Sequence, residues 1–312
     1  MLPTVHILYE NPTWLPPLMA ALEVERFPVR LHDLSTGTID GGAVPERGIW
    51  LNRMSPSAHT RGHGSAVALM TEVLGWLEAH GRRVVNGSNA FALEVSKLRQ
   101  DVALRRHGIR TPRTVLAVGR DKLLEAARLF DGPFLTKHNQ GGKGLGIQRI
   151  GSAAELEAWL DAGEMEQSPN AQVVLQEYVQ APEPFVTRVE LVGGRFLFAM
   201  RSSTVGGFEL CPSDFCQAER KQPDVCPADG VATFSASPLR PDDELVRQYL
   251  AFCAAERIEI AGIELVEDAE GNRYTYDVNA NTNYSAILGK QLGIDGMTEV
   301  ARWLARDVAP GV

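Results

Sequence analysis

The spacing of apolar residues divides this chain into short strands and amphipathic helices. Residues 5–9 form an apolar run of strand length, whereas residues 65–80 repeat apolar positions at the period of a helix. Segments of these two kinds alternate through residues 1–96, and this alternation predicts a mostly parallel sheet. In this part of the chain we expect strands at 5–9, 29–31, 48–51 and 84–85, and helices at 15–27 and 65–80.

A second α/β unit is predicted beyond a long helix. One continuous helix is expected over residues 88–106, and Thr111-Pro112 ends the helical pattern and opens the unit. Ser152 and Glu155 have the spacing of a capping box, which predicts a helix that starts after Ser152. The remaining elements expected here are strands at 114–117, 133–137, 146–150 and 173–179, and a helix at 121–130.

The last part of the chain is predicted to be rich in strands. Gly193-Gly194 between two alternating segments indicates a hairpin. The elements expected here are strands at 186–191, 195–201, 262–266 and 274–279, and helices at 242–256 and 296–306. We therefore divide the chain into three parts, residues 1–96, 97–179 and 180–312.

Polar side chains converge on one face of the last predicted hairpin. Side chains alternate between the faces of a strand, so Asp277 and Asn279 share one face, while Tyr276 and Val278 share the other. The intervening turn places Glu264 across from Asp277 or Asn279, with side chains about 5 Å apart. Two carboxylates and an amide oxygen at such spacing favour a hard cation, Mg²⁺ or Mn²⁺. A solvated polar face is the alternative.

A glycine-rich loop at residues 138–146 has the composition of a phosphate-binding flap. Glycines let backbone amides approach phosphate oxygens closely. The loop is not a Walker A motif, because Lys143 is followed by Gly144. Lys137 before the loop suits a phosphate contact, and residues 176–179 at a strand end suit an adenine edge. A mobile hairpin and a solvated lysine are the alternatives.

Composition limits the classes of function. The chain has 312 residues, of which 44% are hydrophobic and 22% charged, and its net charge is -8. This charge argues against a broad nucleic-acid surface. Neither a membrane-spanning run nor a signal peptide is found, so we expect a cytoplasmic protein with no membrane partner. The cysteines at 211, 216, 226 and 253 are expected as reduced thiols, with a metal site or a substrate loop as alternatives for the first three.

The order of these motifs resembles the ATP-grasp superfamily, and within it the RimK-like carboxylate–amine ligase family. The series runs from a helix lysine through a strand lysine, a glycine flap, Gln-Glu-Tyr-Val and an arginine hairpin to an acid and an acid-x-Asn pair. Further matching segments are residues 53–55, 85–88, 96–98, 106–112, 134–137 and 261–264. The resemblance implies an α/β (α+β) ATP-grasp fold. It would have an N-terminal parallel-sheet pre-ATP-grasp domain (1–96), a small central lid (97–179) and a C-terminal antiparallel-sheet lobe (180–312).

The resemblance also implies roles for individual residues, with ATP and two Mg²⁺ (or Mn²⁺) as cofactors. The expected phosphate ligands are Lys97, Lys137 and the flap residues Gly141, Gly142, Lys143 and Gly144. Adenine is expected at Gln176, Glu177, Tyr178 and Val179, with Glu183 or Glu177 at the ribose. The expected metal ligands are Glu264, Asp277 and Asn279. Arg188 and Arg201 are expected to stabilise the transferring phosphoryl group and the acyl-phosphate.

The implied activity is an ATP-dependent ligase that joins a carboxylate to an amine through an acyl-phosphate. The implied substrates are an amino acid, a peptide or a protein terminus, and the implied assembly is a homodimer or homotetramer. An ATP-grasp small-molecule kinase and a nucleotide-binding module without ligase activity are the alternatives. The chain departs from the family at Val186, at residues 206–216 and at Asn281-Thr282-Asn283, which leaves the added amino acid open.

Overall fold

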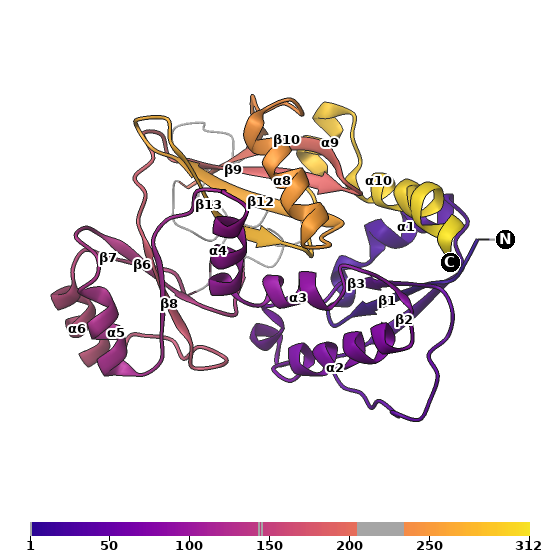
Figure 1. Cartoon of the computed structure of the whole chain (residues 1–312), viewed down its shortest axis with the longest axis horizontal. Helices are drawn as coiled ribbons and strands as arrows, with labels where there is room; N and C mark the ends of the chain where they lie inside the picture. The colour runs from indigo at the N-terminus through magenta and orange to yellow at the C-terminus, as the bar shows by residue number, and fades with distance from the viewer. Residues whose placement is uncertain (1, 143, 145, 205–233) are drawn as a thin grey trace.

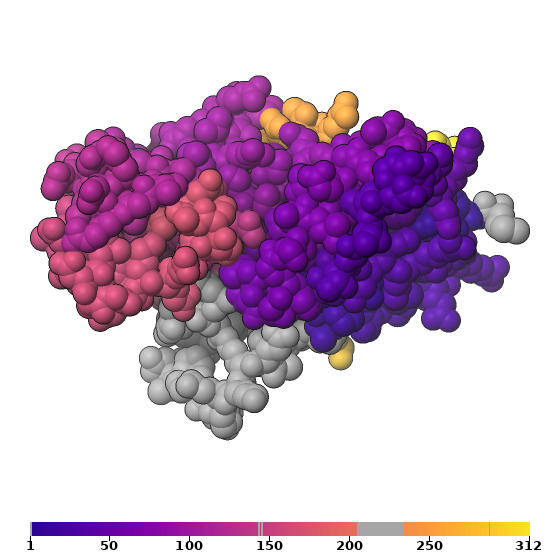
Figure 2. Space-filling model, turned by 90° about the horizontal axis from the view of Figure 1, so that it is seen from below, coloured from indigo at the N-terminus to yellow at the C-terminus, as the bar shows by residue number. Residues whose placement is uncertain are grey.

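The structure is a computed structural model that describes residues 2–142, 144, 146–204 and 234–312 (Figure 1). Three sheets organise these residues, two with four strands and one with five. The N-terminal sheet and the central sheet lie at opposite ends of the molecule, and Figure 2 shows the same separation from below. Within the described residues, no helix is long and apolar enough to cross a bilayer.

The N-terminal sheet is parallel, as the sequence predicts. It consists of β1 (Val5–Tyr9), β2 (Val29–Asp33), β3 (Ile49–Asn52) and β4 (Arg83–Val85), in the order β2-β1-β3-β4. Helix α1 (Pro16–Val24) packs on the face that carries Val5 and Ile7, and α2 (Ala66–Ala79) packs on the face that carries Leu8. Because helices cover both faces, the central strands β1 and β3 are buried almost throughout.

The predicted helix over residues 88–106 was wrong, because the structure has two helices there. Helix α3 (Ser88–Glu94) ends before Ser96, and α4 (Lys97–Arg106) begins after it. Ser96 has an extended backbone, and its hydroxyl accepts a hydrogen bond from the Arg99 amide at 3.3 Å, as an N-cap residue does. The break places Lys97 beside the loop that follows strand β6 (Phe134–His138), since the Lys97 amide donates to the Asn139 carbonyl at 3.1 Å.

The central sheet is antiparallel and has its own core. Its strands are β5 (Thr114–Ala117), β6 (Phe134–His138), β7 (Gln148–Ile150) and β8 (Val173–Glu177), in the order β5-β8-β6-β7. Helices α5 (Arg120–Ala127) and α6 (Ala153–Asp161) pack against it, at the left of Figure 1. Ser152 caps α6 as predicted, because its hydroxyl accepts from the Glu155 amide at 3.2 Å.

The C-terminal sheet is antiparallel and carries most of the functional side chains. Its strands are β9 (Phe185–Val192), β10 (Arg195–Ser203), β11 (Phe234–Ala236), β12 (Ile260–Glu267) and β13 (Arg273–Asn279), in the order β11-β10-β9-β12-β13. Helix α8 (Glu244–Ala255) covers one face and buries Tyr249 and Phe252. This arrangement leaves the other face of β9, β12 and β13 free to carry polar side chains.

The first and last segments of the chain share one hydrophobic core. Helices α9 (Ala286–Leu292) and α10 (Gly296–Trp303) follow the last strand, and α10 packs beside α1 (Figure 1). Trp303 therefore lies in the same cluster as Ile7 of β1 and Val192 of β9. The three sheets fall within the three predicted parts, but α4 joins the third sheet, because the Gln100 side chain hydrogen-bonds both backbone groups of Val278. The three-part division stays a prediction.

Candidate functional site

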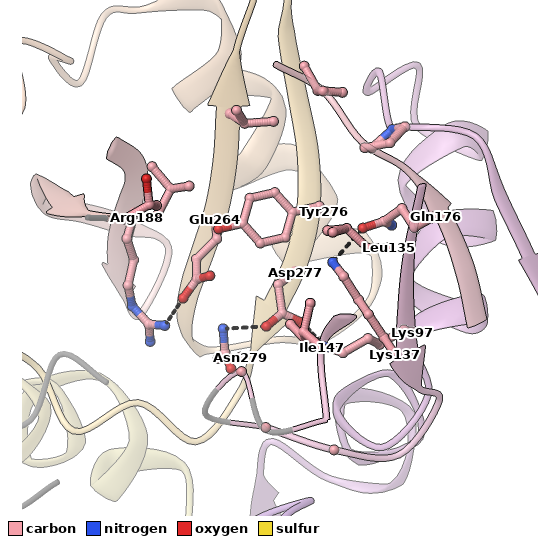
Figure 3. Close-up of a pocket in the computed structure, with 18 of the residues that line it drawn as sticks. Lys97, Leu135, Lys137, Ile147, Gln176, Arg188, Glu264, Tyr276, Asp277 and Asn279 are labelled. Carbon is pink, nitrogen blue, oxygen red and sulfur yellow. Dashed lines mark hydrogen bonds and ion pairs between the residues drawn. The ribbon is translucent and has the colours of Figure 1, made fainter. Parts of the chain in front are cut away.

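A cleft of about 490 Å³ lies where the three sheets meet. Side chains of the N-terminal part, the central sheet and the C-terminal sheet all line it. The predicted site residues among its lining are Lys97, Lys137, Gly141, Gly142, Gly144, Gln176, Glu177, Tyr178, Val179, Glu183, Arg188, Glu264, Asp277 and Asn279. Lys97 and Asp277, which lie 180 positions apart in the sequence, are thus brought to one cavity (Figure 3).

Lys97 and Asp277 form a buried ion pair at the centre of the cleft. The Lys97 Nζ donates to Asp277 Oδ1 at 2.7 Å, and both side chains are mostly shielded from solvent. Burial opposes the charge on Lys97, but the Asp277 carboxylate and other nearby carboxylates together outweigh it and raise the pKa of Lys97. Burial likewise opposes the charge on Asp277, but Lys97 and other nearby cations together outweigh it and lower the pKa of Asp277. Both groups are therefore charged at neutral pH.

Lys137 is a second buried lysine, and none of the described carboxylates lies within hydrogen-bonding reach of it. Its Nζ donates to Gln176 Oε1 at 2.6 Å and lies 5.0 Å from the centre of the Tyr276 ring. Burial lowers the pKa of Lys137 to about 7, and the nearby Lys97 acts in the same direction. A negatively charged ligand is the group that would restore its full charge.

Arg188 is fixed by carboxylates on both sides. Its Nε donates to Glu190 Oε1 at 2.7 Å, and its Nη1 donates to Glu264 Oε1 at 2.7 Å. Burial opposes the charge, but Glu190 and Glu264 outweigh it and raise the pKa of Arg188. The guanidinium lies over Gly262, where a Cβ atom would overlap it. The sheet therefore holds a permanent cation beside Glu264.

The register of the last hairpin agrees with the prediction in part. Glu264 pairs directly with Asp277, and Asn279 lies farther along the same strand with its Nδ2 3.4 Å from Asp277 Oδ2. The predicted face of Tyr276 was wrong. A bulge after Glu264 pairs the next residue with Thr275, so Tyr276 lines the cleft instead of sharing the buried face of Val278.

The oxygen atoms of this hairpin suit a hard divalent cation. Glu264 and Asp277 face each other, and in the structure their charges are balanced by Arg188 and Lys97. The Asn279 side-chain nitrogen donates to the Gly262 carbonyl and to Asp277, so the Asn279 side-chain oxygen stays available as a metal ligand. Mg²⁺ prefers such an all-oxygen set. The described residues contain no group of three or more His, Cys, Asp or Glu side chains placed to hold a metal, so this hairpin offers two carboxylates and one amide oxygen.

The end of β8 forms the wall that the sequence assigns to adenine. Residues 176–179 line the cleft in succession, and the Tyr178 amide donates to the Pro133 carbonyl at 3.0 Å. Glu177 accepts a hydrogen bond from the Arg113 amide at 3.0 Å. Glu183, the other candidate for the ribose, lines the same part of the cleft and is exposed.

The glycine-rich loop closes the cleft towards the N-terminal part. Gly141, Gly142 and Gly144 line the cleft, and Gly144 has a positive φ of 74°, which glycine adopts at low cost. The Gln140 side chain reaches the Pro56 carbonyl at 3.5 Å, so the loop touches the segment that follows β3. Lys143 lies outside the described residues.

The structure separates Arg201 from the other predicted residues, which corrects the prediction that it assists Arg188. On paired strands, opposite residues share a face, and Arg188 lies opposite Met200 while Arg201 lies opposite Thr187. The two arginines therefore point to opposite faces of the sheet. The Arg201 guanidinium stacks 4.1 Å from the ring centre of Phe185, and Arg201 is not among the described residues that line the cleft.

The cysteine predictions divide between two regions. Cys211, Cys216 and Cys226 lie outside the described residues, as do residues 206–216. Cys253 is a free thiol on the buried face of α8, and burial raises its pKa to about 12. Cys253 is therefore inert at neutral pH.

The sequence analysis did not predict several buried polar residues of the site. Glu94 lines the cleft, and burial raises its pKa to about 7. Glu190 is fully buried beside Arg188, and Arg53 donates to the Thr282 carbonyl at 2.8 Å. The two-residue period of β9 could have placed Glu190 on the same face as Arg188. No local pattern distinguishes Glu94 from a solvated residue.

Comparison with known proteins places the fold among ATP-grasp enzymes. No family model matches the chain. A D-alanine–D-alanine ligase from Stutzerimonas stutzeri is 25% identical over 198 residues, which are 62% of this chain and 57% of that protein. A probable alpha-L-glutamate ligase from Teredinibacter turnerae is 30% identical over 138 residues, which are 44% of this chain and 45% of that protein. The chain thus spans about half the length of these two relatives.

Solved structures match over nearly the whole chain. An ATP-grasp RimK-domain protein from Sphaerobacter thermophilus has a TM-score of 0.69 at 16% identity, and the match covers 96% of this chain and 98% of that one. The ATP-grasp ligase PsnB, solved with a phosphomimetic precursor variant, Mg and ADP, has a TM-score of 0.66 at 18% identity, covering 97% and 98%. The predicted fold class is confirmed.

Proposed function

We propose that this protein, which has the fold of the ATP-grasp superfamily and relatives among its carboxylate–amine ligases, is itself an ATP-dependent ligase that forms an amide bond. The observation that carries this proposal is the arrangement at the centre of the cleft. Two buried lysines, a pair of facing carboxylates and a buried arginine surround one cavity. This combination suits a polyphosphate with its counter-ions better than a neutral ligand.

The proposed nucleotide site uses groups that are already in place. Lys97 and Lys137 would bind phosphate oxygens, and residues 176–179 would hold the adenine. Glu264, Asp277 and Asn279 would hold Mg²⁺, which, when bound, neutralises charge on the β- and γ-phosphates. The glycine-rich loop would cover the phosphates and exclude water from the reactive phosphoryl group.

The proposed reaction has two steps. A substrate carboxylate oxygen attacks the γ-phosphorus of ATP, the bond to the bridging oxygen breaks, and ADP leaves. The amine then attacks the carbonyl carbon of the acyl-phosphate, loses a proton and expels phosphate. Arg188 lies beside Glu264 at 2.7 Å, where a fixed cation stabilises the charge of the transferring group. No covalent nucleophile of the protein is needed.

The proposed substrate class is inferred from the relatives and is therefore a broad one. The two curated relatives and PsnB are ligases by name, and PsnB was also solved with a precursor peptide. We therefore propose an amino acid, a peptide or a protein terminus as the substrate. The homo-oligomeric state and the cytoplasmic location stay predictions.

The test is the substrate dependence of ADP release. A ligase releases stoichiometric ADP and phosphate when a carboxylate and an amine are both present, and hydroxylamine in place of the amine traps a hydroxamate. A small-molecule kinase would give a stable phosphorylated product without any amine. A binding module would bind ATP with no turnover. Either of the last two results, across a mixed library of amino acids and peptides, contradicts the proposal.

A further inference from the structure

Glu190 is a fully buried carboxylate next to the proposed catalytic arginine. It lies two residues beyond Arg188 on β9, on the same face of the sheet, and its relative exposure is 0%. Its Oε1 accepts a hydrogen bond from Arg188 Nε at 2.7 Å. A carboxylate in such a position is costly to bury unless it is paired, so Glu190 and Arg188 each keep the other's charge compensated.

The two carboxylate partners of Arg188 differ in what else they can do. Glu264 is a proposed metal ligand that reaches the cleft, where its side chain is 13% exposed. A divalent cation would compete with Arg188 for the Glu264 oxygens. Glu190 does not line the cleft, so a bound cation leaves its bond to Arg188 intact. Glu190 is therefore the permanent partner of the guanidinium.

Glu190 also connects Arg188 to the segment that follows β13, through Thr282. The Thr282 hydroxyl lies 3.1 and 3.3 Å from the two Glu190 oxygens and donates to them. The Thr282 carbonyl accepts from Arg53 Nη1 at 2.8 Å, and Arg53 Nη2 also donates to the Asn283 side chain. Thr282 and Asn283 line the cleft, so one chain of contacts runs from this wall to Arg188.

We propose that Glu190 is a positioning residue that holds the Arg188 guanidinium against the γ-phosphoryl position, with Thr282 fixing the Glu190 carboxylate. The inference rests on the proposed function. It adds a residue that acts through Arg188 and does not touch the substrate. Positioning matters because a displacement of about 1 Å in a catalytic group costs about 100-fold in rate.

The test is Glu190→Gln, which keeps the shape of the side chain and removes its charge. The matched control is Glu259→Gln, which breaks another Arg–Glu pair, with Arg83, outside the cleft lining. We expect Glu190→Gln to lower kcat by about 100-fold and to raise the KM for ATP by about 10-fold, because the contact of Arg188 with the γ-phosphoryl position is lost. Glu259→Gln should leave both values near those of the unchanged protein.

A binding measurement separates this inference from the proposed activity. If Glu190 aims Arg188 at the γ-phosphoryl position, Glu190→Gln weakens AMP-PNP about 10-fold, which equals one lost charge-assisted contact, and leaves ADP unchanged. Isothermal titration calorimetry with Mg²⁺ measures both affinities. Absence of turnover in the unchanged protein contradicts the proposed function, while the comparison of AMP-PNP with ADP still decides the role of Glu190.

A double variant tests whether Glu190 acts through Arg188. In an Arg188→Ala background, Glu190→Gln should have no further effect on kcat, because the group that it positions is gone. Should Arg188→Ala not fold, Arg188→Lys provides the background, judged by circular dichroism. An equal loss of kcat in both backgrounds, or a Glu190→Gln protein that behaves like Glu259→Gln, overturns the inference.

Discussion

Binding of a triphosphate should draw a proton onto Lys137. Lys137 is 4% exposed, and its nearest hydrogen-bonding partner is the neutral Gln176 at 2.6 Å. Burial lowers its pKa from an ordinary 10.5 to about 7, so the free protein carries a partly neutral lysine near neutral pH. Phosphate oxygens beside the amine favour the ammonium form. Nucleotide binding is therefore coupled to proton uptake.

The size of the effect follows from the pKa shift. The change from 10.5 to about 7 corresponds to about 5 kcal/mol against the charged form in the free protein. At pH 8, about one tenth of the free protein has a charged Lys137, so binding should take up about 0.9 proton. At pH 6, most of the protein is already charged, and the uptake should fall to about 0.1 proton.

The assay is calorimetric titration with AMP-PNP in buffers of different ionisation enthalpy. The slope of the observed enthalpy against that of the buffer gives the number of protons taken up. Lys137→Met removes the titrating group and should abolish the uptake at pH 8. Lys122→Met is the control, because Lys122 is exposed and pairs with Glu125 away from the cleft. Equal uptake by the Lys137→Met and unchanged proteins would refute the reasoning.

Three other predictions concern stability and rate. Between pH 7 and 10.5 the unfolded chain binds more protons at Lys137 than the folded protein does. The free energy of unfolding, measured by urea titration, should therefore rise with pH across this window, and Lys137→Met should flatten that rise. Asp277→Asn should lower kcat by about 100-fold or more while the circular dichroism spectrum stays unchanged, and an unaffected rate would contradict the metal assignment. Gly262→Ala should lower kcat by about 100-fold, because the added Cβ would displace the Arg188 guanidinium. The control is Gly271→Ala, at the open hairpin turn outside the cleft, which should leave kcat near that of the unchanged protein.

Much of the fold follows from local patterns that the sequence displays openly. The alternating segments of the last hairpin predict both strands, whereas the pairing of Glu264 with Asp277 depends on the bulge after Glu264. The parallel sheet follows from short apolar runs separated by helices. Local periodicity suffices in these places because each strand or helix has one clearly apolar face.

The wrong predictions share a physical cause: each depends on a tertiary contact that local sequence patterns do not indicate. The helix break at Ser96 depends on Asn139, which lies in a distant loop and accepts the Lys97 amide. The bulge that turns Tyr276 into the cleft shifts the register by one residue, and a two-residue period cannot show this. Arg201 was assigned from resemblance, and only the strand pairing with Thr187 shows that it faces away from Arg188.

The site itself was predicted as a set of residues and not as a network. Lys97, Lys137 and Asp277 were named from the order of motifs, and the structure brings them into one cleft. Their ionisation could not be predicted, since it depends on tertiary contacts: Lys97 forms an ion pair with Asp277, whereas Lys137 donates to the neutral Gln176. The role of Glu190 depends on the position of Thr282, which lies 92 residues away in the sequence.

Transfer of oxygen from the carboxylate substrate to phosphate tests the central claim most directly. With a substrate whose carboxylate carries ¹⁸O, together with an amine and ATP, mass spectrometry of the released phosphate should show one ¹⁸O atom for each amide formed. That label arises because the carboxylate oxygen attacks the γ-phosphorus and leaves with it. Unlabelled phosphate accompanied by amide product would contradict an acyl-phosphate route and, with it, the mechanism assigned to this cleft.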